Sequence, residues 1–391
     1  MDWAALLLFW VAAAMFGYAY AGFPLLVFLF GTFRRARPVR AAAITPRASL
    51  VIAAHNEAEN IGARLENALA ADYPLGALEI MVASDGSTDG TESIVEGFAG
   101  RGVRLLRLPR AGKIAALEVA ARAASGEVLI FSDANTFFER GTLHALVRSF
   151  ADPAVGGVVG HTAYFVRAQS QSSGLGERLY WRYDTWIKRL ESRAGSVVSA
   201  HGGLYAVRRE LFRVPADRAV TDDFIISTEV VAQGQRLVFE PDAIAWEEAA
   251  PRAGQEFGRR VRLMTRGLRA VYLRRALLNP WRYGRYALFL FSHKVVRRLV
   301  PLSLVALLVS SLALSGRSGF FAAAGLAQAS LYTLAAAGFL LRGTALGRAR
   351  VFYVPFFYCM ANAAALVAWF RFLRGDRISL WQPQRSAAGA S

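Results

Sequence analysis

Two long apolar stretches at the ends of the chain constrain its fold more than any other feature. One covers residues 3–33 and the other roughly 299–370, and a segment of ordinary globular composition lies between them. A membrane-spanning helix needs about 20 predominantly apolar residues, so both stretches are long enough to cross a bilayer. We therefore expect a globular domain held between membrane helices. This organisation also accounts for a hydrophobic fraction of 54%, which is high for a soluble protein.

Residues 3–33 are predicted to form an N-terminal transmembrane helix rather than a cleaved signal peptide. The stretch is longer than the apolar core of a signal peptide, and no basic residue precedes it. A basic cluster follows it instead, made up of Arg34, Arg35, Arg37 and Arg40. Because positive residues accumulate on the cytoplasmic side of a membrane, the chain is expected to enter the cytoplasm after residue 33.

Three further spans are predicted, near residues 299–315, 319–341 and 351–370, and a tail covers 371–391. The charge rule conflicts with this count, because three spans after a cytoplasmic domain would leave an arginine-bearing tail outside. Residues 281–298 mix aromatic and basic side chains, which favours an amphipathic helix lying in the membrane interface. An extra packed helix of the globular domain is the alternative for this segment.

Arginine supplies nearly all of the positive charge. The net charge is +17, and the only lysines are Lys113, Lys188 and Lys294. Nucleic-acid binding would suit such a charge, but no recognition motif is present and the arginines cluster beside apolar segments. This distribution excludes a nucleic-acid partner and favours anionic lipid head groups. A single cysteine, Cys359, leaves no disulfide framework or thiolate metal site within one chain.

Strand-like and helix-like runs alternate from Ser49 onward. The expected strands are residues 50–54, 78–83, 103–108, 128–131 and 155–159, and the expected helices are 58–70, 91–98, 114–124 and 142–150. This alternation predicts right-handed crossovers and an α/β fold with a mixed, mostly parallel sheet. Later in the chain we expect helices at 175–193, 223–233 and 257–275 and extended structure at 196–207.

Acidic motifs directly follow two of the expected strands. Asp85 opens the first motif after residues 78–83, and Asp133-Ala134-Asn135 comes after 128–131. The carboxyl ends of strands form the ligand crevice of an open α/β sheet. Neither a Gly-x-Gly-x-x-Gly fingerprint nor a P-loop is present to bind phosphates. Because Mg²⁺ binds one or two carboxylates together with substrate phosphates, the motifs predict a metal and nucleotide site. Carboxylates in such a crevice also suggest a catalytic base.

From about Ser49 to Leu273 the order of motifs resembles a membrane-bound family 2 glycosyltransferase with a GT-A fold. Such enzymes are similar to cellulose, hyaluronan and poly-N-acetylglucosamine synthases. The matching stretches are residues 51–57, 84–90, 112–113, 133–135, 202–209 and 221–224. Each stretch alone is a weak signal, whereas six of them in the family's order and approximate spacing are a strong one. The resemblance implies a cytoplasmic GT-A domain over residues 45–275, carried by a multi-pass protein of the bacterial inner membrane.

The resemblance also implies a role for each matching polar residue. The donor-binding residues would be His55, Asn56, Glu57, Asp85, Lys113 and Asp133. Asp133 and Asn135 would hold Mg²⁺ or Mn²⁺ on the diphosphate. Residues beside the acceptor would be His201, Gly202, Gly203, Asp222, Arg259, Arg260 and Arg262. Asp223 would be the base, because an attacking hydroxyl must lose its proton to a carboxylate opposite the leaving group.

Two stretches depart from the family pattern. Asn135 stands where many relatives have a second carboxylate, which weakens the charge of the metal site. Residues 259–263, Arg-Arg-Val-Arg-Leu, stand where many processive members have Gln-x-x-Arg-Trp. The tryptophan of that motif offers the acceptor sugar an aromatic platform in polymerising relatives. Its absence here makes polymerisation a weaker expectation.

The function that the resemblance implies is inverting transfer of a sugar to a membrane-associated acceptor, as in exopolysaccharide synthesis. The donor would be a nucleotide sugar, a UDP-sugar in preference to a GDP-sugar. The acceptor would be a lipid or a growing glycan at the lipid bilayer, with possible export partners. Transfer of a single sugar to a lipid is the alternative. A non-catalytic scaffold subunit of a polysaccharide export complex is a third, less favoured interpretation.

Overall fold

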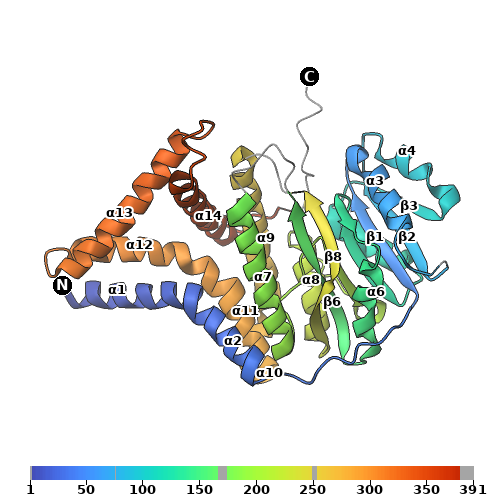
Figure 1. Cartoon of the computed structure of the whole chain (residues 1–391), viewed down its shortest axis with the longest axis horizontal. Coiled ribbons are helices and arrows are strands. Elements are labelled where there is room, and N and C mark those ends of the chain that lie inside the picture. Colours follow the sequence, from blue (N-terminus) through green and yellow to red (C-terminus); the bar gives the residue numbers. More distant parts are fainter. Residues whose placement is uncertain (1, 75, 166–173, 249–252, 379–391) are drawn as a thin grey trace.

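In the computed structural model, a sheet-containing domain lies on one side and a group of long helices extends away from it (Figure 1). The structure describes residues 2–74, 76–165, 174–248 and 253–378. Two helices, α7 (Gly174–Ala194) and α9 (Ala253–Leu273), lie between the sheet and the long helices. The sheet-containing domain and the long helices are therefore distinct parts of the architecture.

Eight strands form one mixed sheet, in the order β3-β2-β1-β4-β7-β6-β8-β5. The strands are β1 (Ala48–Ala54), β2 (Leu78–Asp85), β3 (Val103–Leu108), β4 (Val128–Asp133), β5 (Thr136–Phe138), β6 (Val155–Phe165), β7 (Leu204–Arg208) and β8 (Arg236–Glu248). Strands β1 to β4 are parallel to one another, and β6 is parallel to β8. Only β7 and β5 run antiparallel to their neighbours. The sheet confirms the predicted mixed, mostly parallel fold.

The central strand β1 is buried on both faces, as expected of a parallel strand covered by helices on each side. Leu50 and Ile52 point into one core, with side chains of α3 (Ala58–Leu69), α4 (Thr91–Glu96) and α6 (Thr142–Arg148). Val51 and Ala53 point into a second core, with side chains of α5 (Lys113–Ala123), α7 and α8 (Asp222–Ala232). The second core also takes in Phe23 and Val27. It therefore joins the sheet to the first apolar helix.

Strand β5 and the long strand β8 were not predicted from the sequence. Pro241 lies inside β8, and proline normally argues against a strand because it lacks an N–H. Here the β6–β8 pairing shifts register between Gly160 and His161, which accommodates the irregular stretch. Within the segment predicted as extended, residues 196–207, the strand begins only at Leu204.

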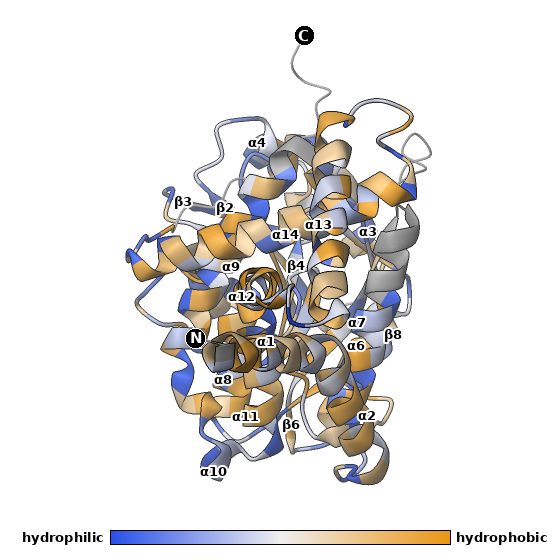
Figure 2. Ribbon diagram, turned by 90° about the vertical axis from the view of Figure 1, so that its left-hand side faces the viewer, coloured by the Kyte–Doolittle hydropathy of each residue, from blue (hydrophilic) through white to orange (hydrophobic). Residues whose placement is uncertain are grey.

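Four helices in the described part of the chain are long and apolar enough to cross a membrane: Trp3–Phe33, Arg285–Leu314, Gly319–Leu340 and Arg350–Leu373. The first comprises α1 (Asp2–Gly17), a π-helical turn and α2 (Phe23–Phe33). The second comprises α11 (Arg285–Leu290), another π-helical turn and α12 (Arg297–Leu314). The last two are α13 (Gly319–Leu340) and α14 (Arg350–Leu373). Apolar residues cover much of α1, α12 and α13 (Figure 2).

The segment predicted as a separate interfacial helix, residues 281–298, is divided in the structure. A short helix, α10 (Pro280–Tyr283), precedes α11, and from Arg285 onward the chain is helical without a break up to Leu314. Tyr286, Phe289 and Leu290 are buried in the core of the globular domain. For these residues the structure favours the alternative of a packed helix, because their aromatic and aliphatic side chains find partners on the domain.

Candidate functional site

The predicted donor motifs meet at the carboxyl ends of three neighbouring strands. Asp85 is the last residue of β2 and Asp133 the last residue of β4. Strand β1 lies between them and leads directly into His55, Asn56 and Glu57. Parallel pairing brings the three strand ends to one edge of the sheet.

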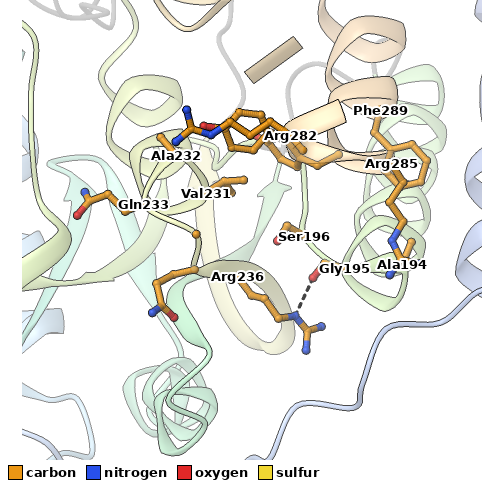
Figure 3. A pocket seen from close by; sticks show the side chains of 14 residues that line it. Ala194, Gly195, Ser196, Val231, Ala232, Gln233, Arg236, Arg282, Arg285 and Phe289 are labelled. Carbon is orange, nitrogen blue, oxygen red and sulfur yellow. Dashed lines mark hydrogen bonds between the residues drawn. The ribbon is translucent and has the colours of Figure 1, made fainter. Parts of the chain in front are cut away.

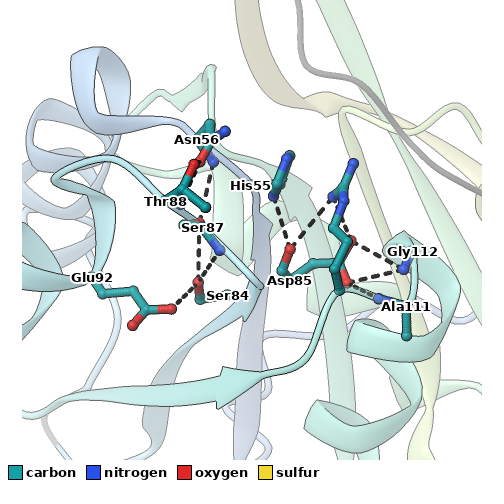
Figure 4. A network of polar contacts seen from close by, with 10 residues as sticks. His55, Asn56, Ser84, Asp85, Ser87, Thr88, Glu92, Ala111 and Gly112 are labelled. Atoms are coloured by element: carbon teal, nitrogen blue, oxygen red, sulfur yellow. Dashed lines mark hydrogen bonds and ion pairs between the residues drawn. The ribbon is translucent and has the colours of Figure 1, made fainter.

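The carboxylate of Asp85 is buried and bound by the loop before α5 (Figure 4). Its Oδ1 accepts hydrogen bonds from the backbone N–H of Ala111 at 2.7 Å and of Gly112 at 2.9 Å. Arg110 Nη1 lies 2.6 Å from its Oδ2. Asp85 therefore shapes the loop that leads into Lys113. Its predicted contact with the base or ribose of the donor stays a prediction.

His55 and Asn56 hold the strand ends together. The ring Nδ1 of His55 lies 2.8 Å from the backbone oxygen of Asp85. Burial and then the charge of Arg110 lower the pKa of His55. Asn56 has a φ of 56°, a left-handed conformation that asparagine tolerates better than most residues. Its Oδ1 accepts a hydrogen bond from Thr88 N–H at 2.7 Å (Figure 4).

Glu57 is a buried carboxyl beside the metal motif. Its Oε2 accepts a hydrogen bond from Asn60 Nδ2 at 3.0 Å, and its backbone N–H donates to Thr91 Oγ1 at 2.8 Å. Burial raises the pKa of Glu57 to about 7, and the charge of Asp133 acts in the same direction. Glu57 is therefore a carboxyl near the site whose pKa lies in the neutral range.

Lys113 joins the donor motif to the predicted acceptor motif. It is the first residue of α5, and its Nζ lies 2.6 Å from Asp133 Oδ1 and 2.9 Å from Asp222 Oδ2. Burial works to lower the pKa of Lys113, but the two carboxylates outweigh it and raise that pKa. Lys113 thus stays positively charged and balances two carboxylates that lie 89 positions apart in the chain, from 133 to 222.

Asp222 and Asp223 start helix α8 and have opposite electrostatic environments. Burial opposes ionisation of Asp222, but the charge of Lys113 overcomes it and lowers the pKa of Asp222. Burial and then the charge of Asp222 raise the pKa of Asp223 to about 6. Asp223 Oδ1 also accepts a hydrogen bond from Phe224 N–H at 2.7 Å. The pair combines a carboxylate of lowered pKa, Asp222, with one whose pKa is raised to about 6, Asp223, which is near the range suited to a general base.

Gly202 and Gly203 differ in what surrounds them. A Cβ at Gly202 would lie 3.3 Å from Asp133 Oδ2 and 3.9 Å from Lys113 Nζ, so Gly202 borders the carboxylate cluster. A Cβ at Gly203 would lie 2.8 Å from Thr162 Oγ1, inside the packed sheet. Next to them, burial and then the charge of Lys188 lower the pKa of His201 to about 3, so its ring is neutral.

We expect alanine at these two glycines to have separable effects. Gly203→Ala should lower the melting temperature by a few degrees, because the added methyl group overpacks Thr162 at a cost of about 1–3 kcal/mol. Gly202→Ala should leave the melting temperature nearly unchanged and weaken nucleotide binding, because its methyl group crowds Asp133. Thermal unfolding and nucleotide titration of both variants test this. Equal melting temperatures for the two variants would contradict it.

The three arginines of α9 that were predicted as site residues have different neighbours. Arg259 Nε and Arg260 Nε contact Glu256 at 3.0 and 2.8 Å, and Arg260 also lies over the ring of Phe357, 4.5 Å from its centroid. Burial and then the charge of Arg266 lower the pKa of Arg262. The structure therefore ties Arg259 and Arg260 to a carboxylate of their own helix. Their predicted contact with the acceptor stays a prediction.

Two residues that lie beside the carboxylates, Arg266 and Tyr205, were not predicted as site residues from the sequence. Arg266 is buried, and its Nε donates to the backbone oxygen of Val220, two residues before Asp222, at 3.0 Å. Tyr205 is buried on β7, and no hydrogen-bond partner of its hydroxyl is present among the described residues. Burial and the nearby Asp222 raise the pKa of Tyr205. Tyr205 belongs to the quoted glycine motif, so its position was the available signal.

Asp133 is the group best placed to hold a cation. No group of three or more His, Cys, Asp or Glu residues that could hold a metal is present in the described residues. Asp133 is 27% exposed, and the absence of a side chain at Gly202 leaves space against its Oδ2. Asn135 Nδ2 donates to Glu247 Oε1 at 3.4 Å. These residues fit an ion such as Mg²⁺ that keeps most of its ligands as water and substrate phosphate.

Comparisons with known proteins show which proteins the chain is similar to. Residues 49–214 match the model of glycosyl transferase family 2. The poly-beta-1,6-N-acetyl-D-glucosamine synthases of Staphylococcus aureus (strain COL) and Staphylococcus epidermidis (strain ATCC 35984) are each 26% identical to the chain, over 224 and 223 residues. The matched part is 55% of this chain and 53% of each synthase, so the chain spans about half the length of these curated relatives.

A solved structure resembles nearly the whole chain. The mannosyltransferase PcManGT from Pyrobaculum calidifontis, in complex with GDP-Man and Mn²⁺, has a TM-score of 0.71 and 25% sequence identity to it. The similarity covers 94% of this chain and 99% of the mannosyltransferase. It therefore includes the long helices as well as the sheet.

Proposed function

We propose, on the premise that the chain is a family 2 glycosyltransferase with a GT-A fold, that it transfers a sugar with inversion from a nucleotide-sugar donor to a membrane-associated acceptor. The observation that carries this proposal is the pair of contacts made by Lys113, at 2.6 Å to Asp133 and 2.9 Å to Asp222. These contacts bring the end of β4 and the start of α8 together. A diphosphate bound at the end of β4 and an acceptor hydroxyl at the start of α8 would then lie within reach of each other.

The arrangement supports a division of labour among the charged groups. Asp223, with its raised pKa, accepts the proton of the acceptor hydroxyl. Lys113 offers a buried positive charge to the leaving diphosphate, at a position where the low local dielectric strengthens the interaction. Asp133, with Asn135 beside it, would hold a divalent ion, which supplies Lewis-acid stabilisation of the leaving group when bound. Asp222 keeps Lys113 in place.

The proposals for the donor nucleotide and for the metal rest on the sequence motifs and on the similarity to a solved structure. The related mannosyltransferase is described with GDP-Man and Mn²⁺, which supports a nucleotide sugar and a divalent cation here. A UDP-sugar remains the donor that the motifs favour, with a GDP-sugar as the second choice. The four apolar helices support placement of the acceptor at a membrane. The basic cluster that follows the first span is the reason for proposing a cytoplasmic catalytic domain at a bacterial inner membrane.

Two outcomes for the acceptor are distinguishable. The similarity to poly-beta-1,6-N-acetyl-D-glucosamine synthases favours extension of an extracellular polysaccharide. The pairing of Arg259 and Arg260 with Glu256, in place of a Gln-x-x-Arg-Trp motif, favours transfer of a single sugar to a lipid. A non-catalytic scaffold is the least favoured function, because the carboxylates and Lys113 are assembled.

The test is a screen of UDP- and GDP-sugars for diphosphate release by the purified full-length protein in lipid nanodiscs. We expect one donor to release its diphosphate with Mg²⁺ or Mn²⁺ and a chelator to stop the release. Size analysis of radiolabelled product separates a polymer from a single-sugar glycolipid. Release from no donor with either metal would contradict the proposal and favour the scaffold.

We expect the transfer rate to fall on the acid side with a pKa near 6. Below this pKa Asp223 is protonated and cannot accept a proton, so kcat/KM should drop about tenfold per pH unit. Above it the carboxylate is free and the rate should level off. Glu57 titrates nearby, at about 7, so the profile of Glu57→Gln is the control. Loss of the acid limb in that variant would assign the limb to Glu57 instead.

A further inference from the structure

A pocket lies at the opposite end of α8 from Asp222 and Asp223. Its volume is about 620 Å³. It is lined by the segment after α7, by the turn between α8 and β8, and by α10 and α11. Arg236, Arg282 and Arg285 stand on different sides of it (Figure 3). None of its lining residues is acidic.

In the part of the chain that the structure describes, two arginines of this pocket donate to backbone oxygens, and none of its arginines forms an ion pair. Arg236 donates to the backbone oxygens of Gly195 at 3.0 Å, Arg37 at 2.7 Å and Ser192 at 3.3 Å. Arg285 Nη1 donates to the backbone oxygen of Arg34. Arg282 lies over the ring of Tyr283, 5.3 Å from its centroid. In the described residues, no carboxylate lies within 4.0 Å of a guanidinium nitrogen of the three lining arginines.

Arg236 is held close to another positive charge. Burial lowers the pKa of Arg236, the charge of Asp152 opposes this effect, and the charge of Arg285 adds to it. Asp152 is itself engaged by the backbone N–H of Ala154 at 3.0 Å and of Arg40 at 3.2 Å. A fold that keeps two guanidinium groups near each other beside a cavity is suited to an anion, which would relieve their repulsion.

The pocket lies where two apolar helices end. The first candidate span ends at Phe33 and the second begins at Arg285. The hydrogen bond from Arg285 to Arg34 joins these two ends at the pocket. Trp281, one residue before Arg282, is 95% exposed. Exposed tryptophan beside arginine is typical of the level of the lipid head groups.

We propose that this pocket binds the phosphate of an anionic phospholipid head group through Arg236, Arg282 and Arg285. Guanidinium groups pair with phosphate oxygens in a planar, bidentate geometry, which makes arginine a suitable ligand. The surface potential of an anionic leaflet concentrates such head groups beside basic segments close to the membrane. A lipid bound here would contact α7, α8 and α11 together and so brace the catalytic domain against the membrane helices.

The test compares the thermal stability of the full-length protein in neutral phosphatidylcholine nanodiscs while the fraction of phosphatidylglycerol is raised. Arg282→Gln is the test variant, because within the described residues the Arg282 side chain makes no hydrogen bond or ion pair, and its loss should not impair folding. Arg342→Gln is the matched control, since Arg342 lies over the ring of Phe339, 4.0 Å from its centroid, in the loop after α13. Inorganic phosphate added to phosphatidylcholine nanodiscs is the third arm.

We expect phosphatidylglycerol to raise the melting temperature of the wild type and of Arg342→Gln with similar midpoints. Arg282→Gln should need about fivefold more of the lipid, the effect of losing one arginine contact near an anionic surface. Equal midpoints for all three proteins, or no response of the wild type, would overturn the proposal. Full stabilisation by inorganic phosphate alone would also overturn it and assign the pocket to a soluble anion.

Discussion

Replacing Asp223 with asparagine is expected to lower sugar transfer by a factor of 10² to 10⁴ while leaving nucleotide binding nearly intact. Positioned general bases contribute about this much to a rate, and an amide cannot take up the proton of the acceptor hydroxyl. Burial and then the charge of Asp222 raise the pKa of Asp223 to about 6, so the folded protein resists ionisation of this carboxyl. Single-turnover transfer assays and nucleotide titration of the variant measure the two effects separately.

The same substitution is expected to preserve or raise the stability of the fold, whereas loss of an ordinary contact lowers it. The pKa of Asp223 is higher in the folded chain than in an unfolded one, so its ionisation above about pH 6 weakens the folded state. Asp223→Asn removes that charge and should therefore melt at the same or a higher temperature than the wild type at pH 7.5. A large loss of stability would show that the lost activity came from misfolding.

Asp217 is a control that separates loss of the proposed base from loss of a negative charge near the same helix. Asp217 precedes the same helix and pairs with Arg269, whose Nε lies 2.6 Å from Asp217 Oδ2. It lies outside the contacts of Lys113. Asp217→Asn is expected to retain transfer within a few-fold of the wild type. Equal losses in Asp217→Asn and Asp223→Asn would remove the basis for calling Asp223 the base.

Replacing Lys113 with methionine is expected to affect both activity and stability. Breaking a buried ion pair by removing one partner costs about 3–5 kcal/mol, because the remaining charge stays buried without compensation. The change leaves Asp222 in this state and removes the same partner from Asp133, which is partly exposed. Transfer should fall by a factor of 10² or more, since a preorganised charge at the leaving group is lost as well.

Lys188 provides the control for this second substitution. It forms an ion pair of similar burial with Asp184, in which Lys188 Nζ lies 2.7 Å from Asp184 Oδ2. Lys188→Met should lower the melting temperature to a similar extent and reduce transfer far less. Lys113→Arg keeps the charge and should recover part of the stability. If Lys188→Met lost as much transfer as Lys113→Met, the effect of Lys113 would be one of folding alone.

Much of the donor side of the site could be predicted because it depends on short-range rules. Apolar runs of strand length that alternate with helical periodicity predict a parallel sheet, and the residues after such strands must gather at one edge. Asp85 and Asp133 lie at strand ends for this reason. The apolar helices were predictable from length and composition, because burial in lipid needs nothing from the rest of the chain.

The contacts of Lys113, Arg266 and Asp85 could not be predicted. Each joins segments far apart in the chain, and the choice of partner depends on which helix crosses which strand. Nothing in the sequence indicated that the carboxylate of Asp85 also binds the loop at residues 110–112. Strand β8 was missed because Pro241 interrupts its pattern, and only its pairing with β6 accommodates the break.

The sequence by itself determined which residues could carry the chemistry and which segments could enter a membrane, because both depend on residue type and local spacing. Only the tertiary structure decided which charges neutralise each other. Lys113 balances Asp133 and Asp222, Asp223 keeps a raised pKa beside them, and Arg236, Arg282 and Arg285 gather in a pocket without a carboxylate. Electrostatic energy depends on distance and burial, and both are set only when distant segments pack together.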